Sequence, residues 1–175
     1  MYLVSIYFDE KTEKWIRKYI SDVAKKTNNT FMVNNNVPPH ITIAAFETDK
    51  VDDVISKMES VKNGIKSGSI TWASVATFLP SVIYLAPILN EYLHGLSVNV
   101  NNVISSVDGV KLSDKYQPFN WIPHTTIGKK LAKEEMKIAF EVLQNSFGMF
   151  DGRVVKIGVA KTNPYEEIFN WELRE

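Results

Sequence analysis

Two copies of a short histidine-containing stretch stand out in this 175-residue sequence. Pro39-His40-Ile41-Thr42-Ile43 is repeated as Pro123-His124-Thr125-Thr126-Ile127, with only the middle position changed, and the two copies use two of the 3 histidines. Each copy offers an imidazole, a hydroxyl two residues later and little else that reacts. A repeat of this kind predicts a duplicated structure in which each copy supplies half of one site.

If each copy forms a β-strand, residues two apart point to the same face. His40 with Thr42, and His124 with Thr126, then face a ligand, while the residues between them anchor the strands. Because the pKa of imidazole is about 6.5, one neutral histidine can accept a proton while the other, protonated, donates one. Threonine hydroxyls can donate to phosphate oxygens as charge builds on them. This set of groups predicts cleavage of a phosphodiester without a metal or a cofactor.

The paired motifs resemble the two His-x-Thr/Ser-x motifs of the 2H phosphoesterase superfamily, which includes 2′-5′ RNA ligase-like proteins and cyclic nucleotide phosphodiesterases. The resemblance spans the whole chain, so it implies one domain over residues 1–175 with motifs at 40–43 and 124–127. It implies an α+β fold, a bilobal pseudo-twofold duplication with antiparallel sheets, outer helices and a central cleft. It also implies catalytic roles for the four motif residues, His40, Thr42, His124 and Thr126.

Members of this superfamily often carry an arginine five residues after the second motif histidine. Lys129 stands at that position here, which keeps the positive charge but not the planar guanidinium. We therefore expect Lys129 to bind substrate. Tyr116 and Trp121 precede the second motif and could stack on a nucleobase, although aromatic residues are more often core.

The resemblance implies hydrolysis of a 2′,3′-cyclic phosphate, or a related diester, on a small nucleotide or an RNA end. An alternative is 2′-5′ RNA ligase activity, because the same histidines would serve the reverse direction. A second alternative is a module that binds RNA ends or nucleotides without turnover. Binding alone would not need two titratable groups, so retention of all four motif residues argues against that module.

A catalytic role for the third histidine and the presence of a metal site are both less favoured. His94 has Leu96, not a threonine, two residues later, which favours a structural or surface role. A zinc site is disfavoured because two histidines fall short of the three or four protein ligands that zinc takes.

Composition narrows the class of partner. Lys plus Arg equals Asp plus Glu, so a small or short ligand is favoured over long double-stranded nucleic acid, although a local basic patch could hide in a neutral total. The absence of cysteine excludes disulfides, thiolate nucleophiles and Cys-type zinc sites. No signal-peptide pattern or membrane-spanning run is present in the sequence, so we expect a cytoplasmic monomer.

Hydrophobic periodicity predicts the elements that position the motifs. Alternating apolar runs predict strands over 2–8, 40–46, 69–79, 81–85, 122–128, 153–161 and 167–173, the last two joined by a turn at Asn163-Pro164. Helical spacing predicts helices from Asp9 or Thr12 to Thr27, over 49–63, from Pro87 onward and over 133–147. The second half repeats the order of the first, which predicts two similar lobes of one domain.

Overall fold

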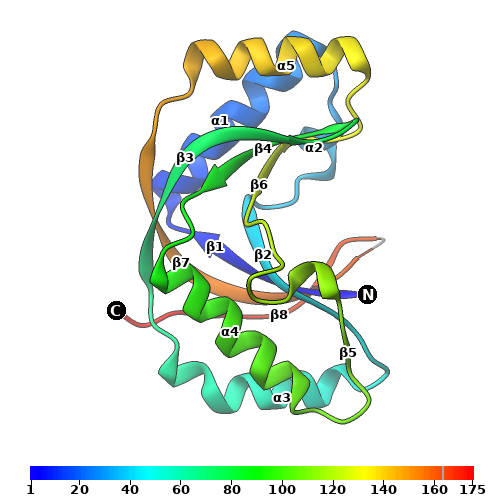
Figure 1. Ribbon diagram of the computed structural model, residues 1–175, viewed down its shortest axis with the longest axis vertical. Coiled ribbons are helices and arrows are strands. Elements are labelled where there is room, and N and C mark those ends of the chain that lie inside the picture. The colour runs from blue at the N-terminus through cyan, green and yellow to red at the C-terminus, as the bar shows by residue number, and fades with distance from the viewer. Residues whose placement is uncertain (163) are drawn as a thin grey trace.

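The computed structural model of the chain describes residues 1–162 and 164–175; the predicted turn at Asn163-Pro164 includes a residue outside these ranges. Its elements follow the order β1 (Tyr2–Phe8), α1 (Glu10–Thr27), α2 (Phe31–Asn35), β2 (His40–Glu47), α3 (Val51–Val61), η1 (Lys62–Gly64), β3 (Gly68–Phe78), β4 (Val82–Pro87), α4 (Glu91–Ser105), β5 (Lys111–Leu112), η2 (Asp114–Tyr116), β6 (Thr125–Gly128), α5 (Lys133–Ser146), β7 (Phe150–Lys161) and β8 (Glu166–Glu172). Figure 1 shows helices above and below a curved sheet. The mixture of helices with an antiparallel sheet confirms the predicted fold class.

The strands form one antiparallel sheet in the order β5-β2-β1-β7-β3-β4-β6, with β8 also paired to β7. Strand β7 joins the two parts of this sheet, because its beginning pairs with β3 and its later residues pair with β8, while β1 lies along its other edge. Although β2 and β6 are far apart in this order, residues of the two strands come within 8 Å between Cα atoms. The curvature of the sheet therefore brings the two motif strands together.

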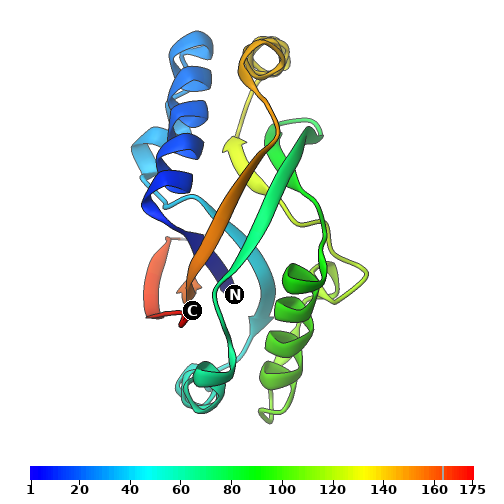
Figure 2. The ribbon, with the colours of Figure 1, turned by 90° about the vertical axis from the view of Figure 1, so that its left-hand side faces the viewer.

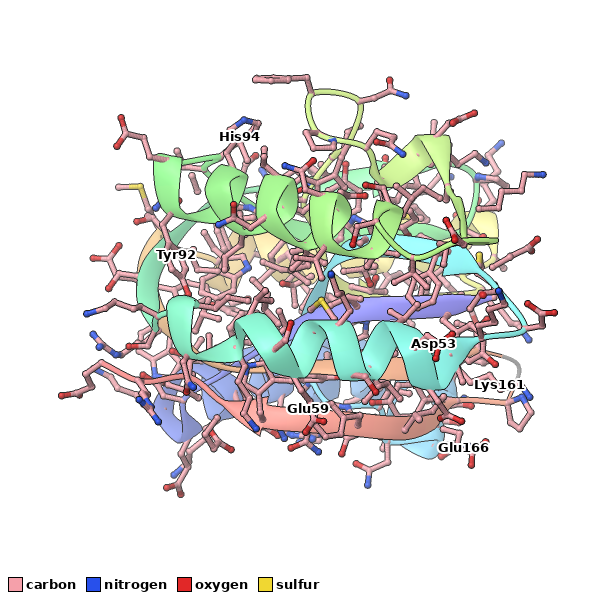
Figure 3. The ribbon with its side chains drawn as sticks, turned by 90° about the horizontal axis from the view of Figure 1, so that it is seen from below. Asp53, Glu59, Tyr92, His94, Lys161 and Glu166 are labelled. Atoms are coloured by element: carbon pink, nitrogen blue, oxygen red, sulfur yellow. The ribbon has the colours of Figure 1, made fainter. Side chains whose placement is uncertain are left out.

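Each motif strand is covered by a helix from the other half of the sequence. Helix α1 packs on β6 and lies beside α5, whereas α4 packs on β2 and lies beside α3 (Figures 1, 2 and 3). Asn101 in α4 donates a side-chain hydrogen bond of 3.2 Å to the Ile43 carbonyl of β2, which ties this helix to the first motif. Each end of the molecule is thus built from both halves of the sequence.

Local signals account for where most helices begin. The Asp9 carboxylate caps α1 by accepting from the Thr12 N–H at 2.7 Å, and the apolar stripe of this helix is buried. The prediction that a helix opens at Pro87 is wrong. Strand β4 continues through Pro87, and the Asn90 side chain caps α4 by accepting from the Leu93 N–H at 2.9 Å.

The second motif strand is shorter than predicted. Pairing between β6 and β4 begins at Thr125, so Ile122, Pro123 and His124 precede the ladder. Proline has no N–H to give to a ladder, which explains why pairing starts beyond it. The short elements α2 and β5 were not predicted. Among the described helices, none is both long enough and apolar enough to cross a membrane.

Candidate active site

The two motif histidines are held in the same way. His40 Nδ1 lies 2.7 Å from the carbonyl oxygen of Pro38, and His124 Nδ1 lies 2.8 Å from that of Ile122. A carbonyl oxygen only accepts, so in each ring Nδ1 carries the proton and donates it. In the neutral ring the lone pair is therefore on Nε2, and each imidazole presents Nε2 as the nitrogen that can exchange a proton with a ligand.

Charged groups from the second half of the chain affect the pKa of His40, which is in the first half. Burial lowers the pKa of His40, the bond to the Pro38 carbonyl partly opposes this, and the positive charges of His124 and Lys129 lower the pKa further. Burial likewise lowers the pKa of His124, opposed by the Ile122 carbonyl. The charges of His124 and Lys129 thus act on His40, and the lowered pKa values make both rings favour the neutral form near neutral pH.

The two motif threonines differ in their surroundings. Thr42 is buried, and its Oγ1 lies 3.2 Å from the Oγ of Ser5, which is directly opposite it on β1. Thr126 is half-buried and lies opposite Tyr84 on β4. Ser5 was not singled out from the sequence, although a serine among the aliphatic and aromatic residues of β1 was an available signal. Either hydroxyl can donate in this pair, and with Ser5 as the donor the Thr42 hydroxyl keeps its own hydrogen for another acceptor.

Thr125 supports the strand from behind. In the sequence it interrupts the apolar side of the second motif, yet it is fully buried, and its Oγ1 accepts a hydrogen bond of 3.1 Å from Trp72 Nε1. Because side chains alternate along a strand, this contact lies on the face opposite Thr126. The Trp72 indole therefore satisfies the one polar group on the core side of β6.

Two aromatic rings contact His124. Its ring centroid lies 4.8 Å from that of Phe78, edge to face, and 5.3 Å from that of Tyr84. Phe78 and Tyr84 also contact each other, at 4.4 Å. These two rings come from β3 and β4 and were not assigned to the site from the sequence; they restrict the orientations open to the His124 imidazole.

A different group lies beside His40. The ring of Tyr7, directly opposite His40 in the β1–β2 ladder, is 6.2 Å away, and its hydroxyl lies 3.2 Å from that of Tyr165. The Lys156 ammonium sits 5.0 Å from the centre of the Tyr7 ring. Burial, followed by the hydrogen bond to Tyr165, raises the pKa of Tyr7 well above its usual range, so its hydroxyl stays protonated.

The other residues expected at the site lie in different surroundings. Trp121 is a core residue with 7% of its surface exposed, and Tyr116 is half-buried and packs against the same core, so little of either ring is open to a nucleobase. Their role in substrate binding stays a prediction. Lys129 is exposed directly after β6. His94 is on α4 (Figure 3), with its ring 4.4 Å from that of Phe119 and outside the contacts that define the site.

The hollows of about 500 and 650 Å³ lie along α1, and none of the four motif residues lines either of them. Over residues 1–162 and 164–175, no three His, Asp or Glu side chains gather closely enough to hold one metal ion. Strands β2 and β6 approach within 8 Å between Cα atoms, and the reactive groups on or beside them are two imidazoles, two threonine hydroxyls and a lysine. Such a set can transfer protons and stabilise an anionic phosphorus centre.

Comparison with known proteins gives a consistent result. Residues 11–165 match the family model of the 2′-5′ RNA ligase superfamily. A search of curated proteins gives no match. Among solved structures, the chain is similar to E. coli LigT complexed with 3′-AMP (12% identity, TM-score 0.63, covering 99% of this chain and 98% of that one). It is also similar to TT0787 of Thermus thermophilus (12%, 0.64, 99% and 97%) and to the MHV ns2 PDE domain (12%, 0.52, 98% and 99%). At these identities the structural matches show a shared fold.

Proposed function

The chain belongs to the 2′-5′ RNA ligase superfamily, as its paired motifs predicted, and from this membership we propose that it is a phosphodiesterase acting by two-histidine acid–base catalysis. The proposed substrate is a 2′,3′-cyclic phosphate, or a related diester, on a small nucleotide or an RNA end. The observation that carries the proposal is the matched pair of imidazoles, each anchored through Nδ1 and each presenting Nε2.

In the proposed reaction, Nε2 of one neutral histidine accepts a proton from water as the water oxygen attacks phosphorus. The bond between phosphorus and one ribose oxygen breaks, and the protonated Nε2 of the other histidine gives its proton to that oxygen. The products are a phosphate monoester and a free hydroxyl. The two histidines end with their protonation states exchanged, so proton exchange with solvent restores the starting state.

The threonines and the lysine act on the charge that builds on the phosphate. Thr42, which shares a strand face with His40, and Thr126, two residues after His124, would donate hydrogen bonds to the non-bridging oxygens. Lys129 would balance the same charge, in keeping with its electrostatic effect on His40. Solved structures of LigT with ATP, 3′-AMP and NADP+ support a small nucleotide as the ligand.

Ligation is the second candidate, favoured by the family description itself. If a ribose 5′-hydroxyl replaced water as the nucleophile, the same two proton transfers would join two RNA ends. A panel of the four 2′,3′-cyclic nucleotides, ADP-ribose cyclic phosphate and a 2′-5′ dinucleotide, with products identified as 2′- or 3′-phosphates, tests hydrolysis. RNA halves ending in a cyclic phosphate and a 5′-hydroxyl test ligation.

Variants of the histidines test the assignment of roles. His40→Ala and His124→Ala should each lower kcat by about 10²–10⁴, the usual contribution of a general acid or base. His94→Ala is the matched control and should keep the parent's kcat, because His94 lies outside the site. Hydrolysis by either motif variant at the parent's rate would show that the acid–base assignment is wrong.

A further inference from the structure

A hollow of about 650 Å³ runs along the first half of α1 and is unrelated to the motif histidines. It is lined by six residues, which we call the α1 groove: Lys11, Lys14, Trp15, Lys18, Tyr19 and Ser146. Its volume is within the range of sites that take small ligands. Every lining residue except Ser146 comes from α1, so the helix provides one continuous wall.

The α1 groove lies behind the sheet, as seen from the motif histidines. Thr125 points away from the ligand face and bonds to Trp72, whose ring stacks on Phe150 at 4.9 Å. Phe150 in turn contacts the Trp15 ring at 5.6 Å. The path from His124 to the groove therefore crosses the core, and a ligand in the groove would not occupy the catalytic face.

The lining of the groove carries positive charge without acidic residues. It contains three lysines and no Asp or Glu, in a chain whose formal net charge is zero. Only Lys18 is paired, with Asp22 at 2.5 Å; within the described residues, Lys11 and Lys14 make no ion pair within 4.0 Å. The lysines are three and four residues apart, so they share one stripe of the helix. This stripe is a local excess of positive charge inside a neutral total.

Trp15 adds an aromatic surface to this charge. The indole is 48% exposed in the groove, and its contact with Phe150 restricts its motion. The apolar stripe of α1, which includes Ile16, Ile20 and Val23, is buried in the protein. Insertion into a bilayer needs such a stripe to be free, so a membrane surface fits the groove poorly.

We propose that the α1 groove binds single-stranded nucleic acid, with a base stacked on Trp15 and adjacent phosphates at Lys11, Lys14 and Lys18. Aromatic rings beside a cationic track are the means by which proteins hold single strands without reading their sequence. A duplex keeps its bases stacked on one another and cannot offer one to the indole. The proposal goes beyond the proposed activity and does not depend on it, because it concerns a surface on the other side of the sheet.

Binding is tested with a fluorescein-labelled oligouridylate that ends in an ordinary 3′-hydroxyl, followed by fluorescence anisotropy over a range of salt. Lys11→Glu/Lys14→Glu should weaken binding at least about tenfold and reduce the slope of log K against log[salt] by about 1.4, at about 0.7 per phosphate contact. Trp15→Ala should weaken binding about tenfold with the slope unchanged, whereas Trp15→Phe, which keeps a ring, should lose less.

Lys50→Glu/Lys57→Glu makes the same change of charge at exposed positions on or beside α3 and should bind as the parent does. Circular dichroism checks that each variant is folded, and turnover of a cyclic mononucleotide should be unaffected by the groove variants. Equal losses in the control and the groove variants would overturn the proposal, as would unchanged binding in both groove variants. Stronger capture by phosphatidylserine vesicles than by the oligonucleotide would overturn it as well. An inactive but RNA-binding protein would refute the proposed hydrolysis alone.

Discussion

The hydrogen bond between Trp72 and Thr125 allows a quantitative test of how the second motif is held. Both residues are fully buried, and the indole Nε1–H donates to the hydroxyl over 3.1 Å. Thr125→Val keeps the shape of the side chain but removes the acceptor, which leaves the N–H buried without a partner. Such a loss costs about 1–3 kcal/mol of unfolding free energy, because the group is desolvated and unpaired. We expect Thr125→Val to be destabilised by an amount in this range.

Urea unfolding followed by circular dichroism measures the cost, provided that the m-value stays the same. Trp72→Phe removes the donor instead, with an additional penalty for the lost ring. In Thr125→Val/Trp72→Phe neither polar group remains, so the double variant should be about 1 kcal/mol more stable than the sum of the single effects predicts. Strict additivity, or a Thr125→Val variant as stable as the parent, would show that this hydrogen bond does not hold β6 in place.

Four further predictions concern the site and the backbone. Because the pKa values of His40 and His124 are both lowered, the alkaline limb of kcat/KM, measured against pH with a cyclic nucleotide, should fall below about 6.5; a limb above neutrality would contradict this. Because both histidines have lower pKa values in the folded protein than in the unfolded chain, the unfolded chain binds more protons as the pH falls below about 6.5. The urea concentration at the midpoint of unfolding should therefore decline over this range of pH. Lys129→Ala removes a charge that lowers the pKa of His40, so the limb set by His40 should move to higher pH while KM rises; an unmoved limb would separate Lys129 from the site. Gly152→Ala should destabilise the protein by about 1–3 kcal/mol, because a Cβ there would lie 2.5 Å from the buried Thr12 side chain and 2.7 Å from Trp72. Gly95→Ala, in open space on α4, should instead stabilise it by about 0.5–1 kcal/mol, and thermal unfolding of the two variants measures both effects.

Much of the local structure was readable from the sequence because burial leaves a periodic trace. Strand β1, helix α1 and helix α5 match their apolar patterns closely, and the predicted start of β2 at His40 is confirmed. The predictions of secondary structure were wrong where contacts with a neighbouring element determine the local conformation. Pro87 is a good first residue for a helix, yet it extends β4, since the next N–H, that of Ile88, bonds to the Thr71 carbonyl across the sheet.

The sequence by itself pointed to the superfamily of this protein, because the duplicated His-x-Thr motif is a local pattern that can be seen without the fold. It could not show that α4 covers the first motif strand and α1 the second, because apolar periodicity tells which face is buried but not which element buries it. Tertiary structure also decided that backbone carbonyls fix both histidine tautomers, that Trp121 is core, and that Trp15 and three lysines line one groove. These outcomes depend on how the chain crosses between the two halves of the sheet, and a local sequence pattern does not contain that information.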